Sequence, residues 1–180
     1  ARMLCGLQKN GSGNVLWAGK PMSRRLRRKK AYMVMQDVGH QLFTDSVAAE
    51  CALGIKAPNK DEIDRTLEKV DLLAYKERHP LSLSGGQMQR LAVVVSDICG
   101  KELLVFDEPT SGLDLESMEE VGALTRSLAT QGKVLLIITH DIEFMMRICT
   151  RILFIRDGEI VEDLFGGQKE KIVRLLRGEE

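Results

Sequence analysis

Two adjacent carboxylates, Asp107 and Glu108, directly follow the apolar run Leu103–Phe106. Such a run predicts a short strand buried on both faces, as in parallel sheets. Pro109 cannot donate a further ladder hydrogen bond, so both acids should lie at the carboxyl edge of the sheet, where open α/β folds bind ligands. Alternation places them on different sides, so that one can hold a metal ion, directly or through water, while the other polarises an attacking water. Taken alone, the pair also fits a solvated acidic turn.

A second group of residues, Ser84 to Gln87, combines a capping signal with two glycines. Ser84 and Gln87 have the spacing of a capping box at the start of a helix. Gly85 and Gly86 weaken the first turn by about 1 kcal/mol each relative to alanine, but they leave its backbone amides open to an anion. The sequence therefore predicts a phosphate site formed by a helix amino terminus and the Ser84 hydroxyl.

The length, charge balance and cysteine content of the chain limit the class of protein. The 180 residues suit one domain with a real core, and Lys plus Arg balance Asp plus Glu at 26 each, so no global charge favours nucleic acid or membrane. No apolar run approaches the roughly 20 residues of a transmembrane helix, and no secretory signal pattern is present. The four scattered cysteines form no CxxC pair and are expected to be reduced core thiols.

The elements that must position these residues alternate between strands and helices, which predicts an α/β sheet with right-handed crossovers. Strands are predicted at 15–18, 32–35, 103–106 and 134–139, with a hairpin of 152–155 and 160–161 around Asp157-Gly158. Helices are predicted from a cap at Thr44 or Asp45 to Ile55, and over 84–99, 115–130, 142–149 and 168–177. Asp61 is predicted to cap a further helix that has Ile63, Leu67 and Val70 on one stripe. Residues 1–7 have the spacing of a helix tail, and 11–13 read as a turn.

The basic run from Arg24 to Lys30 has two interpretations. A patch for nucleic acid or lipid is conceivable, but a charge run is usually a solvated face, and that is the preferred interpretation. His40 and His79 have no chemical context and are interpreted as structural.

Five segments resemble, in order and spacing, the ATP-binding subunits of ABC transporters. They are Gln36 as the Q-loop glutamine, Ser84–Gln87 as the signature, Leu103–Glu108 as the Walker B strand, Ser111–Asp114 as the D-loop and His140 as the switch histidine. The resemblance implies a P-loop NTPase-like, mostly parallel sheet with flanking helices, forming one domain over residues 1–180 with a small helical signature subdomain at about 37–99. The segment Met35–Phe43 further resembles the energy-coupling-factor and cobalt-type import ATPases, which serve vitamin and metal-ion uptake.

The resemblance also implies the cofactors, ATP and Mg²⁺, and the roles around them. Asp107 would bind magnesium through water, and Glu108 would orient or deprotonate the attacking water. His140 would contact the γ-phosphate. Gln36 would reach the magnesium and the water while sensing a membrane partner.

A further set of residues would act across a dimer. Ser84, Gly85, Gly86 and Gln87 would face the γ-phosphate held by a second ATPase subunit, identical or related, and Asp114 would cross the interface. The resemblance implies transmembrane transporter subunits docked near Gln36–Ser46, a place at the cytoplasmic face of the membrane, and no nucleic-acid partner.

One departure from the family pattern concerns the phosphate-binding loop Gly-x-x-x-x-Gly-Lys-Ser/Thr, which the 180 residues do not contain. Gly6, Gly11 and Gly13 imitate its glycine spacing but lack the Lys-Ser/Thr pair. We therefore expect an amino-terminal truncation that removed the loop, so that residues 1–180 alone would have little or no ATPase activity.

Two alternatives to an importer ATPase remain. A non-transport ABC ATPase of the DNA-repair or translation kind is disfavoured, because the segment between Gln36 and Ser84 is short and has no CxxC pair. The other alternative is an inactive half that only presents its signature to a partner, but Glu108 and His140 are both present.

Overall fold

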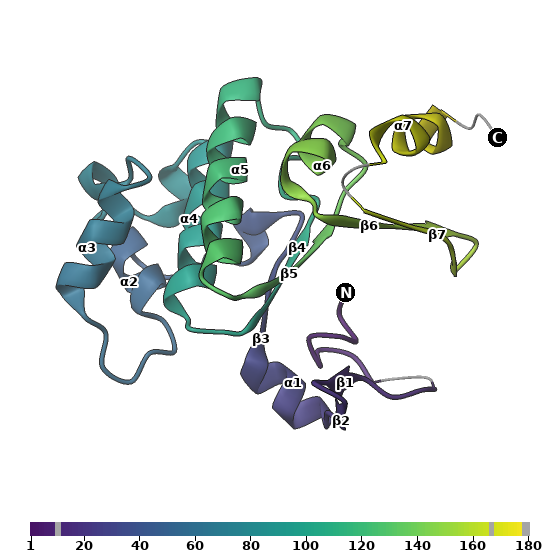
Figure 1. Cartoon of the computed structure of the whole chain (residues 1–180). Coiled ribbons are helices and arrows are strands. Elements are labelled where there is room, and N and C mark those ends of the chain that lie inside the picture. Colours follow the sequence, from purple (N-terminus) through teal and green to yellow (C-terminus); the bar gives the residue numbers. More distant parts are fainter. Residues whose placement is uncertain (10–11, 166–167, 178–180) are drawn as a thin grey trace. The chain divides into compact units, whose positions relative to one another are not determined.

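The computed structural model of the chain describes residues 1–9, 12–165 and 168–177 (Figure 1). The chain forms two compact units, Ala1–Ile138 and Thr139–Glu180. The first contains a parallel sheet and most of the helices, and the second contains a hairpin and two helices.

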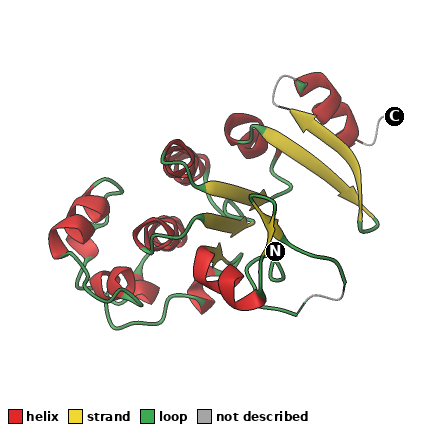
Figure 2. Cartoon of the chain, turned by 60° about the horizontal axis from the view of Figure 1, so that its bottom comes forward, coloured by secondary structure: helices red, strands yellow, loops and turns green. Residues whose placement is uncertain are grey.

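The sheet of the first unit has the strand order β3 (Ala31–Val34), β4 (Leu103–Asp107) and β5 (Val134–Ile138), all parallel (Figure 2). Strand β4 is central, and its three middle residues have no exposed surface. The apolar run before Asp107 therefore forms the doubly buried strand that the sequence predicts. Because the strands are parallel, the chain leaves all three at one edge.

The amino-terminal segment is less regular than predicted. Residues 1–7 form hydrogen-bonded turns rather than a helix, and the Arg24 side chain donates hydrogen bonds to the carbonyls of Gly6 and Leu7. In a helix, those carbonyls would accept hydrogen bonds from the helix backbone or from water. Here they accept from the guanidinium of Arg24, which is distant in the sequence. Gly11 of the predicted turn lies outside the described residues.

A short hairpin and a basic helix connect this segment to the sheet. Strand β1 (Leu16–Trp17) lies within the predicted strand and pairs with β2 (Lys20–Pro21). The basic run forms α1 (Arg24–Lys30), which begins where the Ser23 hydroxyl accepts a hydrogen bond from the Leu26 N–H at 3.2 Å. The four basic residues in its last turn interact favourably with the negative end of the helix dipole.

A helical region connects β3 to β4, as predicted. Its elements are the 3₁₀ turns η1 (Val38–His40), η2 (Leu73–Tyr75) and η3 (Pro80–Ser82) and the helices α2 (Val47–Ala52), α3 (Lys60–Glu68) and α4 (Gly85–Ile98). Their apolar faces form one core around fully buried leucines: Leu67, Leu72 and Leu91. Helix α4 packs on α2, α3 and β3 on one side and on α5 (Leu115–Thr130) on another.

Two predicted helix caps are wrong. Ser46, not Thr44 or Asp45, caps α2, and Asn59, not Asp61, caps α3. Thr44 is engaged elsewhere, because its N–H and hydroxyl both donate to the buried carboxylate of Glu50, at 3.0 and 2.8 Å. Where several capping residues follow one another, a competing contact of this kind can take one of them away from the helix start.

The second unit is built around the predicted hairpin. Strands β6 (Arg151–Arg156) and β7 (Glu159–Phe165) are joined by Asp157 and Gly158, both at positive φ, as a type I′ turn requires. Helices α6 (Ile142–Ile148) and α7 (Lys169–Arg177) complete the unit. Its core consists of Met145, Ile152, Leu164 and Ile172.

The cysteines and two of the histidines have structural surroundings. All four cysteines are free thiols, and burial raises the pKa of Cys51 to about 12. His79 accepts a hydrogen bond from the Leu81 N–H at the start of η3, and His40 pairs with Asp37 at 3.0 Å. Within the described ranges, no three His, Cys, Asp or Glu side chains gather as a metal cluster.

Candidate functional site

The carboxyl edge of the sheet brings the two predicted acids to the end of β4. Asp107 is the last residue of β4 and lies opposite Ile138 of β5. The Glu108 N–H donates to the Ile138 carbonyl at 2.8 Å, so the chain stays attached to β5 for one residue beyond the strand. Both acids are half-buried, whereas Pro109 and Thr110 behind them are buried.

Glu108 has an unusual backbone conformation. Its φ is +50°, in the left-handed region, where a residue with a Cβ is disfavoured by about 1–2 kcal/mol. The conformation ends the strand alternation at Asp107, so alternation no longer fixes the direction of the Glu108 side chain. Strained backbone of this kind is concentrated at functional sites, where the surrounding structure enforces it.

The segment after Glu108 is a compact double turn that leads into α5. The Ser111 N–H bonds the Glu108 carbonyl, and the Leu113 N–H bonds the Thr110 carbonyl, each at 3.2 Å. Gly112 has a φ of +75°, which a residue with a side chain rarely adopts. This turn ends at Asp114.

Asp114, which the resemblance places at a dimer interface, caps α5. Its carboxylate accepts a hydrogen bond from the Ser117 N–H at 2.8 Å. The Ser117 backbone and hydroxyl donors lower the pKa of Asp114 below its ordinary value, and nearby Arg90 adds to the effect. The Asp114 side chain is exposed, so the cap leaves it accessible to a partner.

The predicted capping box at the start of α4 is confirmed. The Gln87 N–H donates to the Ser84 hydroxyl at 3.3 Å, and the Ser84 N–H donates to the Gln87 side-chain oxygen at 2.9 Å. Ser84 and Gly85 are exposed, while Gly86 and Gln87 are half-buried.

The two signature glycines have different surroundings. A Cβ on Gly85 would meet nothing within 4 Å, so this backbone is open as predicted. A Cβ on Gly86 would lie 2.5 Å from the Ser117 hydroxyl oxygen and 3.0 Å from the Ser117 Cβ. Gly86 is therefore needed for the close approach of α4 and α5. Ser117 has no sequence signal that would have identified it, since it is one small polar residue in a helical turn.

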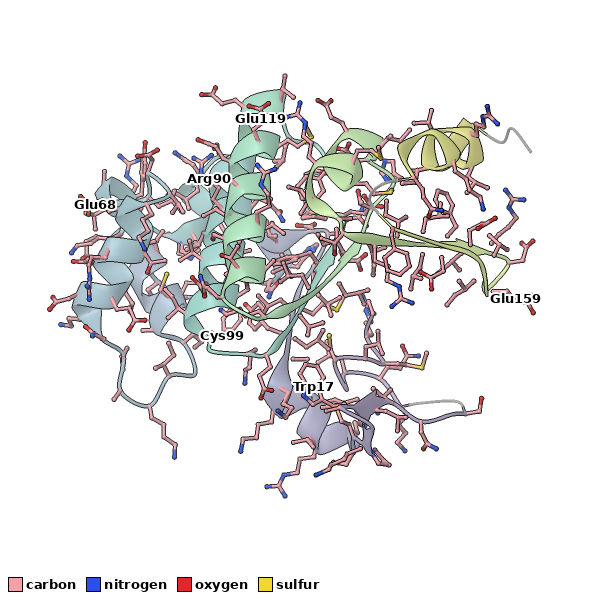
Figure 3. All side chains as sticks on the ribbon, in the orientation of Figure 1. Trp17, Glu68, Arg90, Cys99, Glu119 and Glu159 are labelled. Atoms are coloured by element: carbon pink, nitrogen blue, oxygen red, sulfur yellow. The ribbon has the colours of Figure 1, made fainter. Side chains whose placement is uncertain are left out.

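The starts of α4 and α5 are thus held together. Besides the contact of Gly86 with Ser117, Arg90 of α4 forms an ion pair with Glu120 of α5; Figure 3 labels Arg90. The exposed turn of Ser84 and Gly85 and the Asp114 cap therefore lie on neighbouring helix starts. That they face one partner stays a prediction.

Gln36 leaves the sheet at the same edge as the two acids. Val34, the last residue of β3, pairs with Phe106, so Gln36 follows at the carboxyl edge, where its side chain is exposed. Gln41, which is not among the predicted site residues, holds this segment.

Gln41 holds the end of β3 in place by three hydrogen bonds. Its side-chain oxygen accepts from the Met35 N–H at 3.0 Å, and its amide nitrogen donates to the Met33 carbonyl and the Tyr32 hydroxyl, both at 2.9 Å. Burial raises the pKa of Tyr32 to about 12, so its hydroxyl stays neutral and able to accept that bond.

His140 belongs to the second unit, where its side chain is exposed. The next residue, Asp141, caps α6 by accepting a hydrogen bond from the Phe144 N–H at 3.0 Å. The predicted role of His140 beside Glu108 stays a prediction.

An apolar pocket of about 500 Å³ lies at the opposite edge of the sheet. It is lined by the first residues of the three parallel strands, Ala31, Leu103 and Val134, and by the β1 region. None of the predicted site residues lines it, so the acids at the carboxyl edge remain the better candidate for chemistry.

A comparison with known families decides the class of the protein. The family model described as ABC transporter matches residues 1–111. The chain belongs to the ABC transporter family. A putative ABC transporter ATP-binding protein of Treponema denticola is 56% identical over 172 residues, covering 96% of this chain but 35% of the relative. A protein of the same description from Pyrococcus horikoshii is 35% identical over 179 residues, covering 94% of this chain and 68% of the relative.

Solved structures of ABC proteins have the same fold. CbiO1 of Clostridium perfringens, described as part of the ABC transporter complex CbiONQ, superposes with a TM-score of 0.81 at 26% identity, over 98% of this chain and 75% of that chain. A bacterial Atm1-family ABC exporter with ATP bound gives a TM-score of 0.79 at 23% identity, over 99% of this chain and 32% of that one, which supports the fold alone. The fold is thus the P-loop NTPase-like α/β fold of ABC ATPases. This ABC chain spans about a third of the length of its Treponema relative.

No helix in the described ranges is both long and apolar enough to cross a membrane.

Proposed function

We propose that the chain forms part of an ATP-binding and ATP-hydrolysing subunit of an ABC transporter. The observation that carries this proposal is the carboxyl edge of the sheet. There, Asp107 ends β4, Glu108 is tied to the end of β5 in a strained conformation, and Gln36 follows β3. Phosphoryl transfer needs such a convergence of an acid for the metal ion and a group that orients water.

Asp107 and Gln36 would hold Mg²⁺. Their carboxylate and amide oxygens are the hard donors that Mg²⁺ prefers, and Mg²⁺ usually keeps several waters and uses only one or two protein carboxylates. The bound ion would supply charge neutralisation at the phosphates.

Glu108 would accept the proton of the attacking water. The hydrogen bond of its N–H to Ile138 at 2.8 Å fixes its main chain, so the side chain starts from a defined position. His140, two residues beyond Ile138 in the sequence, would donate to the γ-phosphate.

The signature turn would complete the site of a second ATPase subunit, identical or related. The Ser84 oxygen accepts from the Gln87 N–H, which leaves its own proton free to be donated to a phosphate oxygen. The open backbone of Gly85 offers a further N–H at the positive end of the α4 dipole. Gly86 and Gln87 would hold that turn in shape, and Asp114 on the neighbouring helix start would face the same partner.

The transporter would be an importer of the energy-coupling-factor type, for a vitamin or a metal ion. The likeness to CbiO1, described as part of a transporter complex, and the segment Met35–Phe43 support this narrower proposal. Transmembrane subunits would dock near Gln36–Ser46 and would keep the protein peripheral at the cytoplasmic face of the membrane.

The test is a substitution of Glu108 in the full-length protein. We expect Glu108→Gln to lower ATP hydrolysis by at least about a hundredfold, because it removes the general base, while nucleotide binding measured by calorimetry persists. Glu68→Gln, at an exposed residue at the end of α3, is the control and should leave hydrolysis unchanged. Hydrolysis by the Glu108→Gln protein at the normal rate would contradict the proposal.

We further propose that residues 1–180 on their own bind ATP weakly, because they contain no Gly-Lys-Ser/Thr sequence to hold its phosphates. Calorimetry of this segment with Mg·ATP checks this, and tight binding would refute it.

A further inference from the structure

The zero net charge of the chain conceals an uneven distribution. Residues 1–36 contain nine Lys and Arg residues and no Asp or Glu. The other 144 residues therefore contain 17 basic and 26 acidic residues. Such asymmetry indicates an electrostatic partner for the basic part.

Most of these cations are available to a partner. Arg24 bonds backbone carbonyls, Arg27 is buried, and Lys30 pairs with Glu102. The remaining six are exposed and have no carboxylate partner among the described residues: Arg2, Lys9, Lys20, Arg25, Arg28 and Lys29.

Three of these cations share one face of α1. Arg25, Arg28 and Lys29 are spaced i, i+3 and i+4, which makes them neighbours on a helix surface. Lys101 adds a fourth cation, because its ammonium bonds the Lys29 carbonyl at 2.9 Å. We call these four residues the basic surface. Like charges at this spacing repel one another, and Arg25 lies outside the last turn, where the helix dipole would favour a cation.

Exposed apolar side chains lie beside the basic surface. Leu26 of α1 is 37% exposed and Leu16 of β1 is 56% exposed. The two elements adjoin, since the ammonium of Lys30 stands 5.3 Å from the ring centre of Trp17, labelled in Figure 3. Trp17 itself is half-buried. Cations interleaved with exposed leucines are typical of segments that rest on a lipid surface.

We propose that the basic surface binds the phosphate headgroups of anionic phospholipids, with Leu16 and Leu26 reaching toward the acyl boundary. A lipid surface fits better than nucleic acid, because it accommodates the apolar side chains as well as the charges. This contact is independent of the proposed ATPase activity. It provides the chain with a direct membrane attachment besides any transporter subunit.

The test is co-sedimentation of the protein with vesicles. We expect binding to phosphatidylglycerol-containing vesicles at low salt, little binding to pure phosphatidylcholine, and loss of binding in high salt, where charges are screened. The triple substitution Arg25→Gln, Arg28→Gln and Lys29→Gln should weaken binding about a hundredfold, since each basic residue near an anionic surface contributes roughly fivefold.

A matched variant changes the net charge equally at another place. Lys56→Gln, Lys60→Gln and Lys69→Gln alter exposed lysines of the helical region and should leave vesicle binding intact. Circular dichroism establishes that both variants are folded. Equal vesicle binding by the α1 triple variant and the wild type would overturn the proposal, and so would tighter binding of duplex DNA than of vesicles through the same residues.

Discussion

The end of β4 and the start of α4 are both candidates to face phosphate, but they are held in different ways. The strand end depends on neighbours distant in sequence, since Glu108 is fixed by a hydrogen bond to Ile138. The helix start is fixed almost entirely by its own turn, through the reciprocal bonds of Ser84 and Gln87. Glu108 has a positive φ within this long-range framework, whereas Ser84 caps α4 with an ordinary extended backbone.

The largest effect on stability is expected at the one contact of the helix start that is not local, between Gly86 of α4 and Ser117 of α5. Gly86→Ala places a methyl group 2.5 Å from the Ser117 hydroxyl oxygen, so we expect the free energy of unfolding to fall by about 1–3 kcal/mol. Gly85→Ala meets nothing within 4 Å and should not destabilise the protein. Urea denaturation measures both. Adding Ser117→Ala to Gly86→Ala should recover part of the loss, and equal stabilities of the two alanine variants would show that the helices do not meet there.

The local part of the helix start is tested by removing its cap. Ser84→Ala leaves the Gln87 N–H without its partner and should lower the unfolding free energy by about 1 kcal/mol. Ser84→Asp, which preserves a capping oxygen, is the control and should retain most of the stability. If Ser84→Ala is as stable as the wild type, the capping box does not determine where α4 begins.

The strain at the strand end predicts a smaller effect on the unfolding free energy, of opposite sign. Glycine adopts positive φ freely, so Glu108→Gly should leave the unfolding free energy unchanged or raise it by up to about 1 kcal/mol. The same substitution at Glu119, in the body of α5, should lower it by about 1 kcal/mol. Thermal unfolding of the two variants compares them, and a large loss for Glu108→Gly would mean that its backbone is not strained.

The smallest expected effect is on how the unfolding free energy depends on pH in the acidic range. The pKa of Asp114 is lower in the folded protein because the ionised carboxylate accepts the Ser117 donors. A lowered folded-state pKa contributes stability above the ordinary value of 3.8, and that stability is lost as the pH falls through the folded-state pKa. Asp114→Asn keeps a capping oxygen but cannot titrate. Its unfolding free energy should therefore depend less steeply on pH in that acidic range, whereas parallel pH profiles would disprove the linkage.

The sequence predicted those features whose determinants are close together in the chain. The buried strand before Asp107, the turn at Asp157-Gly158 and the box of Ser84 with Gln87 are each specified by a few consecutive residues. The assignment of Asn59 rather than Asp61 as a cap was missed, because both are good caps and the local sequence does not choose between them.

Features that depend on distant contacts could not be predicted. The positive φ of Glu108 has no sequence signal, because the residue type disfavours it and the bond of its N–H to Ile138 joins it to a strand distant in the sequence. The glycine requirement at Gly86 depends on Ser117, and the end of β3, which precedes Gln36, is held by the three bonds of Gln41. In each case the sequence predicted the site residue but not the residue that holds its backbone in place.

The contact of Gly86 with Ser117 has a consequence for how the protein can vary. A side chain larger than serine at position 117 would crowd the backbone of Gly86, so we expect small residues at this position. A survey of natural variants can use position 117 as an indicator: a bulky residue there would mark proteins in which the two helix starts are packed differently.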